Sequence, residues 1–381
     1  MQSVVESAWI AVVGGGRWAR VTLDVLHDLL PRATRLTIHS PRNANAMREW
    51  AGGRFGERSF AVLDTLPDFG NNLPTALIVV NAARDHEAVA KLGLEVGVPV
   101  LIEKPLALNT VGVNRLISLA VSRGASLAAG HALRFARYIQ NYVSTVASSG
   151  GLAAITVRWC DARVEERYGE LKSYDSSVPI FADCLPHVLS LIAELIPVED
   201  LSFKKIQSYK GGSEVRIDLL VNRVSVEVLL ARNASRRQRW IEAVLINGSK
   251  VSLDFASEPG LINKSGESVV ADPLWCSEQR PLASMLSAFV FGVFEYYWDA
   301  RLSPRLALTT AELVDRMQPI HRKQLLHWAR AEICKAEFSR DVDALDYALR
   351  ELLQWKEGLH KDELNRRVQQ CLVTGVIDVS N

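Results

Sequence analysis

The stretch that decides the fold lies near the N-terminus, where residues 8–20 read AWIAVVGGGRWAR. The apolar run Ala8–Val13 predicts a buried strand, and a helix is expected from Arg17 to about Leu30. Between them stands the motif Gly14-x-Gly16-x-x-Ala19. Small residues at this spacing bind a dinucleotide when they follow a strand and open a helix, although they also suit a plain strand-to-helix turn. The position of the motif favours dinucleotide binding.

Each residue of this motif has a physical role. Gly14 permits the tight turn, Gly16 lets the backbone approach a pyrophosphate, and Ala19 allows the helix to pack closely on the strand. The first N–H groups of the helix and the positive end of its dipole attract phosphate. Arg17 and Trp18 stand in the first helical turn, so we expect both to contact the cofactor.

The first third of the chain repeats the alternation of strand and helix. A helix over about Ala88–Val96 separates two of the apolar runs. Strands that alternate with helices in one direction predict a parallel sheet covered on both faces, a doubly wound α/β domain. The further predicted strands are Leu36–His39, Ala76–Val80, Val98–Ile102 and Ser126–Ala129.

The pattern changes after about His131. A strand over Leu152–Trp159 and a helix over about Pro186–Leu195 precede several strands with short turns, which predict an antiparallel, α+β arrangement. We therefore expect a Rossmann domain over 1–131, an α+β substrate or oligomerisation domain over 132–330, and a helical extension over 331–381. The remaining strands are predicted at Val215–Val221, Val224–Leu230, Trp240–Ile246 and Lys250–Phe255, and a long helix at about Leu282–Trp298.

Composition narrows the class of protein. The 44 basic and 43 acidic residues give a formal net charge of +1, which argues against a nucleic-acid coat. The five cysteines lie far apart without a CxxC pair, so neither structural zinc nor a disulfide framework is expected. The apolar stretch Met285–Phe294 is half the roughly 20 residues that cross a bilayer. A cytoplasmic protein with a small-molecule substrate and no metal is predicted.

The end of the second predicted strand bears on the choice of cofactor. NAD usually requires an acidic residue there for the ribose hydroxyls. The sequence has His39-Ser40-Pro41-Arg42-Asn43 instead. The Ser40 hydroxyl and the Arg42 guanidinium suit a 2′-phosphate, which predicts NADP(H). The alternative is that Arg42 is a solvated loop residue.

Two further segments end predicted strands. Glu103-Lys104-Pro105 follows one strand, and Asn81-Ala82-Ala83-Arg84-Asp85-His86 follows another. Together they resemble the Gfo/Idh/MocA oxidoreductase family, over roughly residues 8–330. The first segment matches the family's Glu-Lys-Pro motif, and the second keeps only the histidine of Thr-Pro-Asn-x-x-His. The resemblance implies cofactor contacts by Asn81, His86, Glu103 and Lys104.

The resemblance also implies a Rossmann domain followed by an open, mostly antiparallel sheet, hydride transfer in the cleft between the two domains, and a homo-oligomer. Lys104 would polarise the reacting oxygen and relay a proton. Pro105 could form a cis bond. The alternative is that Lys104 is a surface lysine at the end of a strand, without a functional role.

A second constellation is Asp183-Cys184-Leu185-Pro186-His187. Four residues apart at a helix start, Asp183 and His187 share one face. Many family members carry Asp-x-Gly-x-His here, and the resemblance implies that Asp183 orients while His187 is the general acid or base. The alternatives are an N-cap aspartate and a core histidine.

The departures from the family pattern concern the substrate. Leu185 replaces a glycine, and Ser177-Val178-Pro179-Ile180-Phe181 replaces a run of small residues. A bulkier, more apolar pocket is expected, which argues against a simple sugar. Arg134 is a candidate ligand for a substrate anion, or equally the partner in a structural ion pair. The other candidate substrate contacts are Tyr138, Tyr168 and Tyr174, with Arg163 and Lys172 as further lining residues.

Taken together, these residues predict an NADP(H)-dependent oxidoreductase that acts on a carbonyl, an alcohol or a C=N group. Two alternatives stay open, an imine reductase of a natural-product pathway and a non-catalytic dinucleotide-binding regulator. The helical extension suits either a partner-binding element or the cover of a subunit interface.

Overall fold

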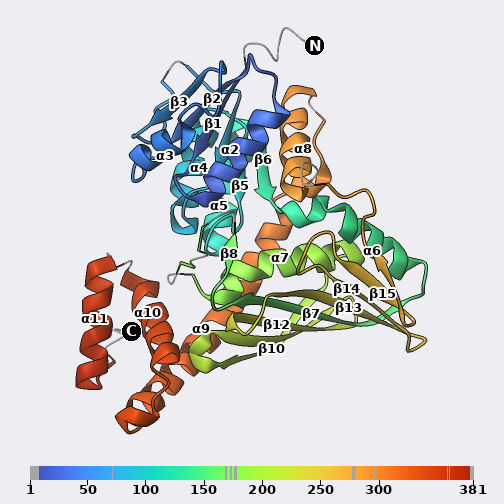
Figure 1. Ribbon diagram of the computed structural model, residues 1–381, viewed down its shortest axis with the longest axis vertical. Helices are drawn as coiled ribbons and strands as arrows, with labels where there is room; N and C mark the ends of the chain where they lie inside the picture. Colours follow the sequence, from blue (N-terminus) through green and yellow to red (C-terminus); the bar gives the residue numbers. More distant parts are fainter. Residues whose placement is uncertain are drawn as a thin grey trace. The chain divides into compact units, whose positions relative to one another are not determined.

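Figure 1 shows the computed structural model, which describes residues 8–70, 72–167, 170–171, 174–175, 178–276, 280–295, 297–357, 359 and 361–377. The chain forms two compact units. The first unit joins the chain up to Gln140 with Leu274–Ala311, and the second joins Asn141–Pro273 with the chain from Glu312 onward. The units therefore interleave along the sequence, whereas the predicted division into 1–131, 132–330 and 331–381 is linear.

The first unit is built on a six-stranded sheet in the order β3-β2-β1-β4-β5-β6, with every neighbouring pair parallel. The strand order reverses between β1 and β4, and ligands of such sheets bind at the carboxyl ends of the strands beside this point. The strands are β1 (Trp9–Val13), β2 (Arg35–His39), β3 (Phe60–Leu63), β4 (Ala76–Val79), β5 (Val100–Glu103) and β6 (Leu127–Gly130).

Helices cover both faces of this sheet, which explains why its central strands are almost wholly apolar. On one face, α2 packs beside α8 (Figure 1), and Leu282, Met285, Leu286 and Phe289 line the buried stripe of α8 at helical spacing. On the other face, α4 and α5 form a second core. The helices of this unit are α2 (Arg17–Leu29), α3 (Ala44–Ala51), α4 (His86–Glu95), α5 (Thr110–Arg123) and α8 (Pro281–Glu295), with 3-10 turns η1 (Ala83–Asp85), η2 (Ala132–Phe135) and η5 (Ala300–Leu302).

The second unit is built on an eight-stranded sheet in the order β10-β11-β12-β7-β13-β14-β15-β16. Its neighbouring strands are antiparallel except for β7 and β12, which are parallel. Its strands are β7 (Leu152–Ala162), β10 (Leu201–Tyr209), β11 (Glu214–Val221), β12 (Val224–Ala234), β13 (Gln238–Leu245), β14 (Lys250–Asp254), β15 (Leu261–Lys264) and β16 (Glu267–Val270), and β8 (Glu166–Arg167) pairs separately with β9 (Glu170–Leu171).

One face of the eight-stranded sheet carries the helix α7 (Ile180–Leu195), as Figure 1 shows. Most of its side chains are buried, which fits its apolar sequence. The connection α6 (Arg137–Ala147) and the 3-10 turn η3 (Lys210–Gly212) complete this part of the chain.

The C-terminal segment folds into helices, as predicted. Its core joins the last turns of α9 with α10 and α11, through leucines such as Leu325, Leu345, Leu349 and Leu364. The elements are α9 (Arg305–Ile333), η6 (Glu337–Ser339), α10 (Val342–Glu357) and α11 (Lys361–Thr374), the last two lying side by side in Figure 1.

The prediction of the two fold classes is confirmed, but several elements differ from it. The elements that were not predicted are α3, β3, α5, α6, β8, β9, β10, β15, β16 and most of α9. The helix predicted to begin at Pro186 begins at Ile180, so Pro186 lies inside it. A proline in a helix interior leaves one carbonyl without its usual N–H donor, and the apolar residues before it outweigh that cost by burial.

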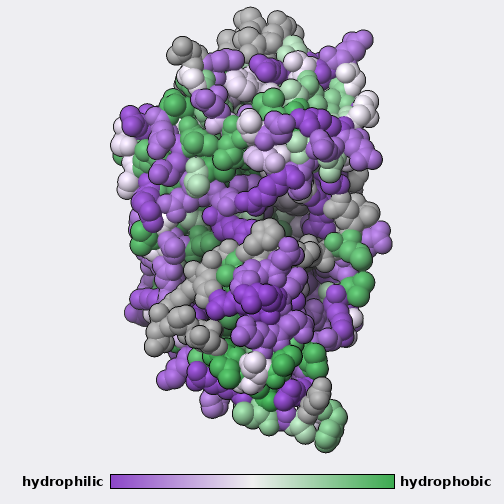
Figure 2. Space-filling view, turned by 90° about the vertical axis from the view of Figure 1, so that its left-hand side faces the viewer, coloured by the Kyte–Doolittle hydropathy of each residue, from purple (hydrophilic) through white to green (hydrophobic). Residues whose placement is uncertain are grey.

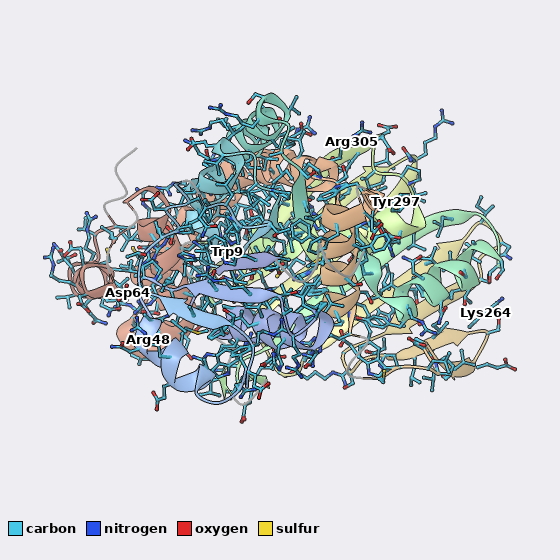
Figure 3. The ribbon with its side chains drawn as sticks, turned by 90° about the horizontal axis from the view of Figure 1, so that it is seen from above. Trp9, Arg48, Asp64, Lys264, Tyr297 and Arg305 are labelled. Atoms are coloured by element: carbon cyan, nitrogen blue, oxygen red, sulfur yellow. The ribbon has the colours of Figure 1, made fainter. Side chains whose placement is uncertain are left out.

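Hydrophilic residues cover most of the face shown in Figure 2. Among the residues labelled in Figure 3, Arg48 of α3 forms an exposed ion pair with Asp64, at 3.4 Å. Trp9, also labelled, lies at the start of β1. Across the described residues, no helix is both long enough and apolar enough to span a membrane.

Candidate active site

The glycine turn between β1 and α2 leaves room for a ligand. Gly16 is the N-cap of α2, it offers no side-chain cap, and the first turn contains no acidic residue. A methyl group built on Gly16 would meet no atom within 4 Å. The N-terminus of α2 therefore has no side-chain cap, and there is open space beside Gly16, an arrangement that fits a phosphate.

The other two glycines of the turn are needed for packing. A Cβ on Gly14 would come within 3.0 Å of Ala19 Cβ and of Val80. A Cβ on Gly15 would clash with the hydroxyl of Ser40, and Asn43 donates a hydrogen bond of 3.1 Å to the Gly15 carbonyl. Sequence analysis gave no role to Gly15, and only the close approach of the segment after β2 reveals one.

The segment after β2 holds the two residues predicted to select NADP(H). Ser40 is buried, and its hydroxyl has no hydrogen-bond partner among the described residues. The Arg42 side chain is 68% exposed and lies 3.0 Å from Asp85. An exposed pair of this kind contributes at most about 1 kcal/mol, so little free energy opposes its exchange for a phosphate.

Lys104 stands directly after β5, and its bond to Pro105 is cis. His86 braces this turn, with Nδ1 2.7 Å from the Pro105 carbonyl and Nε2 3.2 Å from the Asn81 carbonyl. Burial lowers the pKa of His86, and the charge of Lys104 lowers it further. A neutral imidazole has one N–H, which the shorter contact assigns to Pro105.

The residues near Lys104 that were predicted to contact the cofactor differ in their surroundings. His86 is 1% exposed and lies between two backbone carbonyls, so its effect on a cofactor would come through Asn81 and Pro105. The Asn81 Oδ1 atom has no partner among the described residues. Glu103 lies against Gly130, where a Cβ would come within 2.6 Å of Glu103 Oε2.

In the second unit, Asp183 lies in the first turn of α7 and is tied to β12. Arg232 Nη2 donates a hydrogen bond of 3.1 Å to Asp183 Oδ2. The Arg232 side chain is only 4% exposed, whereas that of Asp183 is 36% exposed. A buried guanidinium therefore holds a carboxylate that is partly exposed.

Two tyrosines also lie against Arg232, whose Nη1 and Nη2 lie 3.4 and 3.5 Å from the Val178 carbonyl oxygen. Its guanidinium lies 4.7 Å from the ring centre of Tyr174, and its Nη1 donates a 3.0 Å hydrogen bond to the Tyr347 hydroxyl. Burial raises the pKa of Tyr347, so its hydroxyl stays neutral at pH 7. Burial alone would lower the pKa of Arg232, but Tyr347 and Asp183 outweigh it and keep the pKa above its ordinary value.

His187 lies one helical turn after Asp183 and is half-buried. Its ring stacks on Trp159 of β7, with ring centres 4.5 Å apart and an angle of 14° between the planes. Arg239 lies 4.0 Å from the centre of the same indole and forms a buried ion pair with Asp161. The imidazole therefore lies flat against a buried aromatic ring.

The predicted substrate contacts have different surroundings. Arg134 donates a 3.2 Å hydrogen bond to the Arg301 carbonyl, and Tyr138 is fully buried with its ring against Trp275. These positions favour structural roles for both residues. Tyr174 is 42% exposed and remains a candidate. Arg163 pairs with Asp343 at the surface. Tyr168 and Lys172 lie outside the described residues.

The side chains that argued for an apolar pocket are in the core. Leu185 and Ile180 are fully buried, and Phe181 packs edge to face on His321. Their bulk is therefore taken up by packing, and they give no reason to exclude a sugar. Within the described part of the chain, no three His, Cys, Asp or Glu side chains are grouped so that they could hold a metal ion.

Comparison with known proteins supports the interpretation that the glycine turn belongs to a dinucleotide-binding domain. Residues 9–131 match the family model GFO_IDH_MocA, described as an oxidoreductase family with an NAD-binding Rossmann fold. A UDP-N-acetylglucosamine 3-dehydrogenase of Acidithiobacillus ferrooxidans is 30% identical over 131 residues, which are 34% of this chain and 39% of that protein. The match thus spans about two fifths of that relative.

Solved structures extend the likeness of fold over most of the chain. The same dehydrogenase superposes with a TM-score of 0.64 at 18% identity, over 84% of this chain and 99% of that one. A dehydrogenase from Chromobacterium violaceum gives 0.66 at 17% identity, over 86% and 98%. A variant of a 3-ketoreductase from Actinomadura kijaniata, in complex with TDP-benzene and NADP, gives 0.63 at 17% identity, over 82% and 97%.

The strand order, the open glycine turn and the lysine after β5 all lie within the matched region or directly beside it. Over residues 9–131, the chain is similar to the Gfo/Idh/MocA family of oxidoreductases, whose model describes an NAD-binding Rossmann fold.

Proposed function

We propose that the protein is an NADP(H)-dependent oxidoreductase, in which the bound nicotinamide exchanges a hydride with a carbonyl, an alcohol or a C=N group of a small molecule. The observation that carries this proposal is the unfilled space at Gly16, at the start of a helix without a side-chain cap, in a domain that matches an oxidoreductase family model. Lys104 stands two strands away from this turn, at the same carboxyl edge of the sheet.

Lys104 is the residue proposed to act on the reacting oxygen. Its ammonium stabilises the negative charge that develops on that oxygen during reduction, and it can donate a hydrogen bond to it. The half-buried position strengthens this interaction, because charges attract more strongly where water is partly excluded. Pro105 and His86 fix the backbone on which Lys104 stands.

His187 is the residue proposed to exchange the proton, and Asp183 to orient the reacting group. An imidazole changes protonation near neutral pH, which suits a reversible reaction between a carbonyl and an alcohol. Stacking on Trp159 limits rotation of the ring. The ion pair with Arg232 keeps the Asp183 carboxylate in one position while part of it stays exposed.

The test of this proposal is NADPH oxidation with a panel of carbonyl compounds, and NADP⁺ reduction with the matching alcohols. Since the relatives are named for UDP-N-acetylglucosamine and for 3-ketoreduction, sugar nucleotides and their keto forms are the first probes. Aldehydes and cyclic imines are the second. A dinucleotide that binds without turnover of any probe would favour the regulatory alternative.

Lys104→Met separates catalysis from binding. It should lower kcat by roughly 10²- to 10³-fold, the loss typical of one group that stabilises an oxyanion, while the Kd for NADPH changes little. His187→Asn should lower kcat by roughly 10²-fold or more. If both residues serve one step, the double variant loses less than the product of the single losses. Full turnover in Lys104→Met would refute the role of the lysine.

Arg42→Ala tests the choice of cofactor. Loss of the guanidinium should weaken NADPH binding about tenfold or more and leave NADH binding unchanged, since only NADPH has a 2′-phosphate. Arg48→Ala on α3 is the matched control, because Arg48 is also an exposed arginine paired with an aspartate. Equal losses for the two cofactors in Arg42→Ala would contradict NADP(H) preference.

We also propose a homo-oligomer, which the family resemblance implies. Light scattering of the purified protein would test it, and a single chain at micromolar concentration would contradict it.

A further inference from the structure

The helix α10 lies in the C-terminal segment, more than 200 positions after the part of the chain that matches the family model. It is nevertheless in close contact with the second unit. Gly211 of η3 has φ +63°, and a Cβ there would clash with the carbonyl oxygen of Ala344 in α10. Backbone therefore packs directly on backbone at this point.

The buried face of α10 carries Ala344, Tyr347 and Glu351, at spacings of three and four residues. Glu351 Oε1 lies 2.7 Å from His321 Nε2, and His321 Nδ1 lies 2.7 Å from the Ser208 hydroxyl of β10. This chain of hydrogen bonds and the Gly211 contact hold α10 at both ends of the face. Tyr347 lies between these two contacts, so its position relative to the sheet is fixed.

Tyr347 is connected to Asp183 of the candidate site through the side chain of Arg232. Its hydroxyl accepts a 3.0 Å hydrogen bond from Arg232 Nη1, while Nη2 of the same guanidinium donates to Asp183 at 3.1 Å. The guanidinium is planar and rigid, so its two nitrogens cannot move independently. The position of the Tyr347 hydroxyl therefore constrains the position of the Asp183 carboxylate.

We propose that Tyr347 is a positioning residue that acts through Arg232 on Asp183, and that the C-terminal helix α10 is thereby part of the substrate site. The catalytic half of this inference rests on the proposed role of Asp183, and the structural linkage does not. The burial of Tyr347 and Arg232, 3% and 5% exposed, keeps water from replacing either partner.

Tyr347→Phe is the test, because it removes the hydroxyl and keeps the ring that packs 5.3 Å from Tyr174. It should lower kcat roughly three- to tenfold, the effect of losing one hydrogen bond, with an unchanged Kd for NADPH. In an Asp183→Asn background the same change should have little further effect, because the group that Tyr347 positions is already lost.

A second measurement does not depend on activity. In protein labelled with ¹³C at aspartate carboxyls, the Asp183 resonance is assigned by its loss in Asp183→Asn. It should shift in Tyr347→Phe. Ser208→Ala is the matched control, since it loosens the same helix through His321 and Glu351 without touching Arg232. It should lower Tm and leave both kcat and the Asp183 resonance unchanged.

An unmoved Asp183 resonance in folded Tyr347→Phe, or an equal shift in Ser208→Ala, overturns the linkage. An equal loss of kcat from Tyr347→Phe in the wild-type and Asp183→Asn backgrounds overturns the positioning role. Full turnover of Asp183→Asn itself refutes the proposed role of Asp183, and the resonance still decides whether Tyr347 is linked to it.

Discussion

His86 and His187 have different surroundings, and these favour different roles. His86 is buried, with backbone carbonyls beside both ring nitrogens, so it braces the turn that carries Lys104. His187 is only half-buried, and its ring stacks on an indole rather than lying between two backbone carbonyls. The sequence identified both residues as candidates, but it gave no measure of burial, and burial is what separates a brace from an acid or base.

The stability of the protein should fall as the pH is lowered below about 6.5, the ordinary pKa of histidine. Because burial lowers the pKa of His86, the folded state binds fewer protons than the unfolded state in this range, and acid favours unfolding. One such group contributes up to about 1.4 kcal/mol per pH unit. Denaturant unfolding of the wild type and of His86→Gln at pH 7.5 and pH 5 measures the effect.

The wild type should lose more free energy of unfolding between these two pH values than His86→Gln does. Some dependence should survive in the variant, because burial lowers the pKa of His39 as well. An identical loss in both proteins would show that His86 does not cause it.

The residue that sequence analysis missed altogether is Arg232. It stands 49 positions from Asp183, near the C-terminal end of β12, where the alternation of buried and exposed residues gives way to consecutive buried positions. An ion pair between distant elements leaves no local pattern, whereas Lys104 could be found because a short motif surrounds it. The motif residues were predictable, and the residues that hold them in place were not.

At the scale of elements, the turn from β1 into α2 was predictable because its function depends on residues that are adjacent in sequence. Helix boundaries were less so. α7 extends six residues before Pro186, since burial of Ile180 and Phe181 outweighs the preference of proline for a helix start. The predicted pairing of Asp183 and His187 on one helix face holds for the longer helix, in which Asp183 lies in the first turn.

The glycine turn predicts opposite outcomes for two similar substitutions. Gly16→Ala adds a methyl group to open space, so stability should change by less than about 0.5 kcal/mol, while the Kd for NADPH should rise tenfold or more. Gly14→Ala places the methyl group against Ala19 and Val80, so it should cost about 1–3 kcal/mol by overpacking. Denaturant unfolding and fluorescence titration separate the two effects. Tight NADPH binding by Gly16→Ala would argue against a phosphate at this turn.

The contact between η3 and α10 predicts different stabilities for a second pair of glycine-to-alanine variants. Gly211→Ala should destabilise the protein by more than Gly248→Ala, although both glycines have positive φ. The left-handed backbone costs an alanine about 1–2 kcal/mol at either position, but only at Gly211 does the methyl group meet the Ala344 carbonyl. Urea unfolding of both variants is the measurement. Equal losses would mean that α10 can shift away from η3 at little cost.

At the scale of the whole molecule, composition predicted a near-neutral chain of several domains, but not which segments would share a unit. α8 joins the parallel sheet from about 150 positions after β6, and α10 joins the antiparallel sheet from the far end of the chain. Both associations depend on apolar stripes, which any buried surface can satisfy. Periodicity therefore predicted these helices and could not predict their partners.

Cofactor binding should be visible in the stability of the whole chain. A ligand that binds only the folded state at a hundred times its Kd adds about 2.7 kcal/mol to the free energy of unfolding. NADPH at that excess should therefore raise Tm, and the slowing of backbone hydrogen exchange should centre on the ends of β1, β4 and β5, where the glycine turn, Asn81 and Lys104 lie. Gly16→Ala at the same NADPH concentration should show a smaller rise. Slowed exchange confined to the second unit would place the dinucleotide away from the glycine turn, and the assignment of Gly16 and Arg42 would then be wrong together.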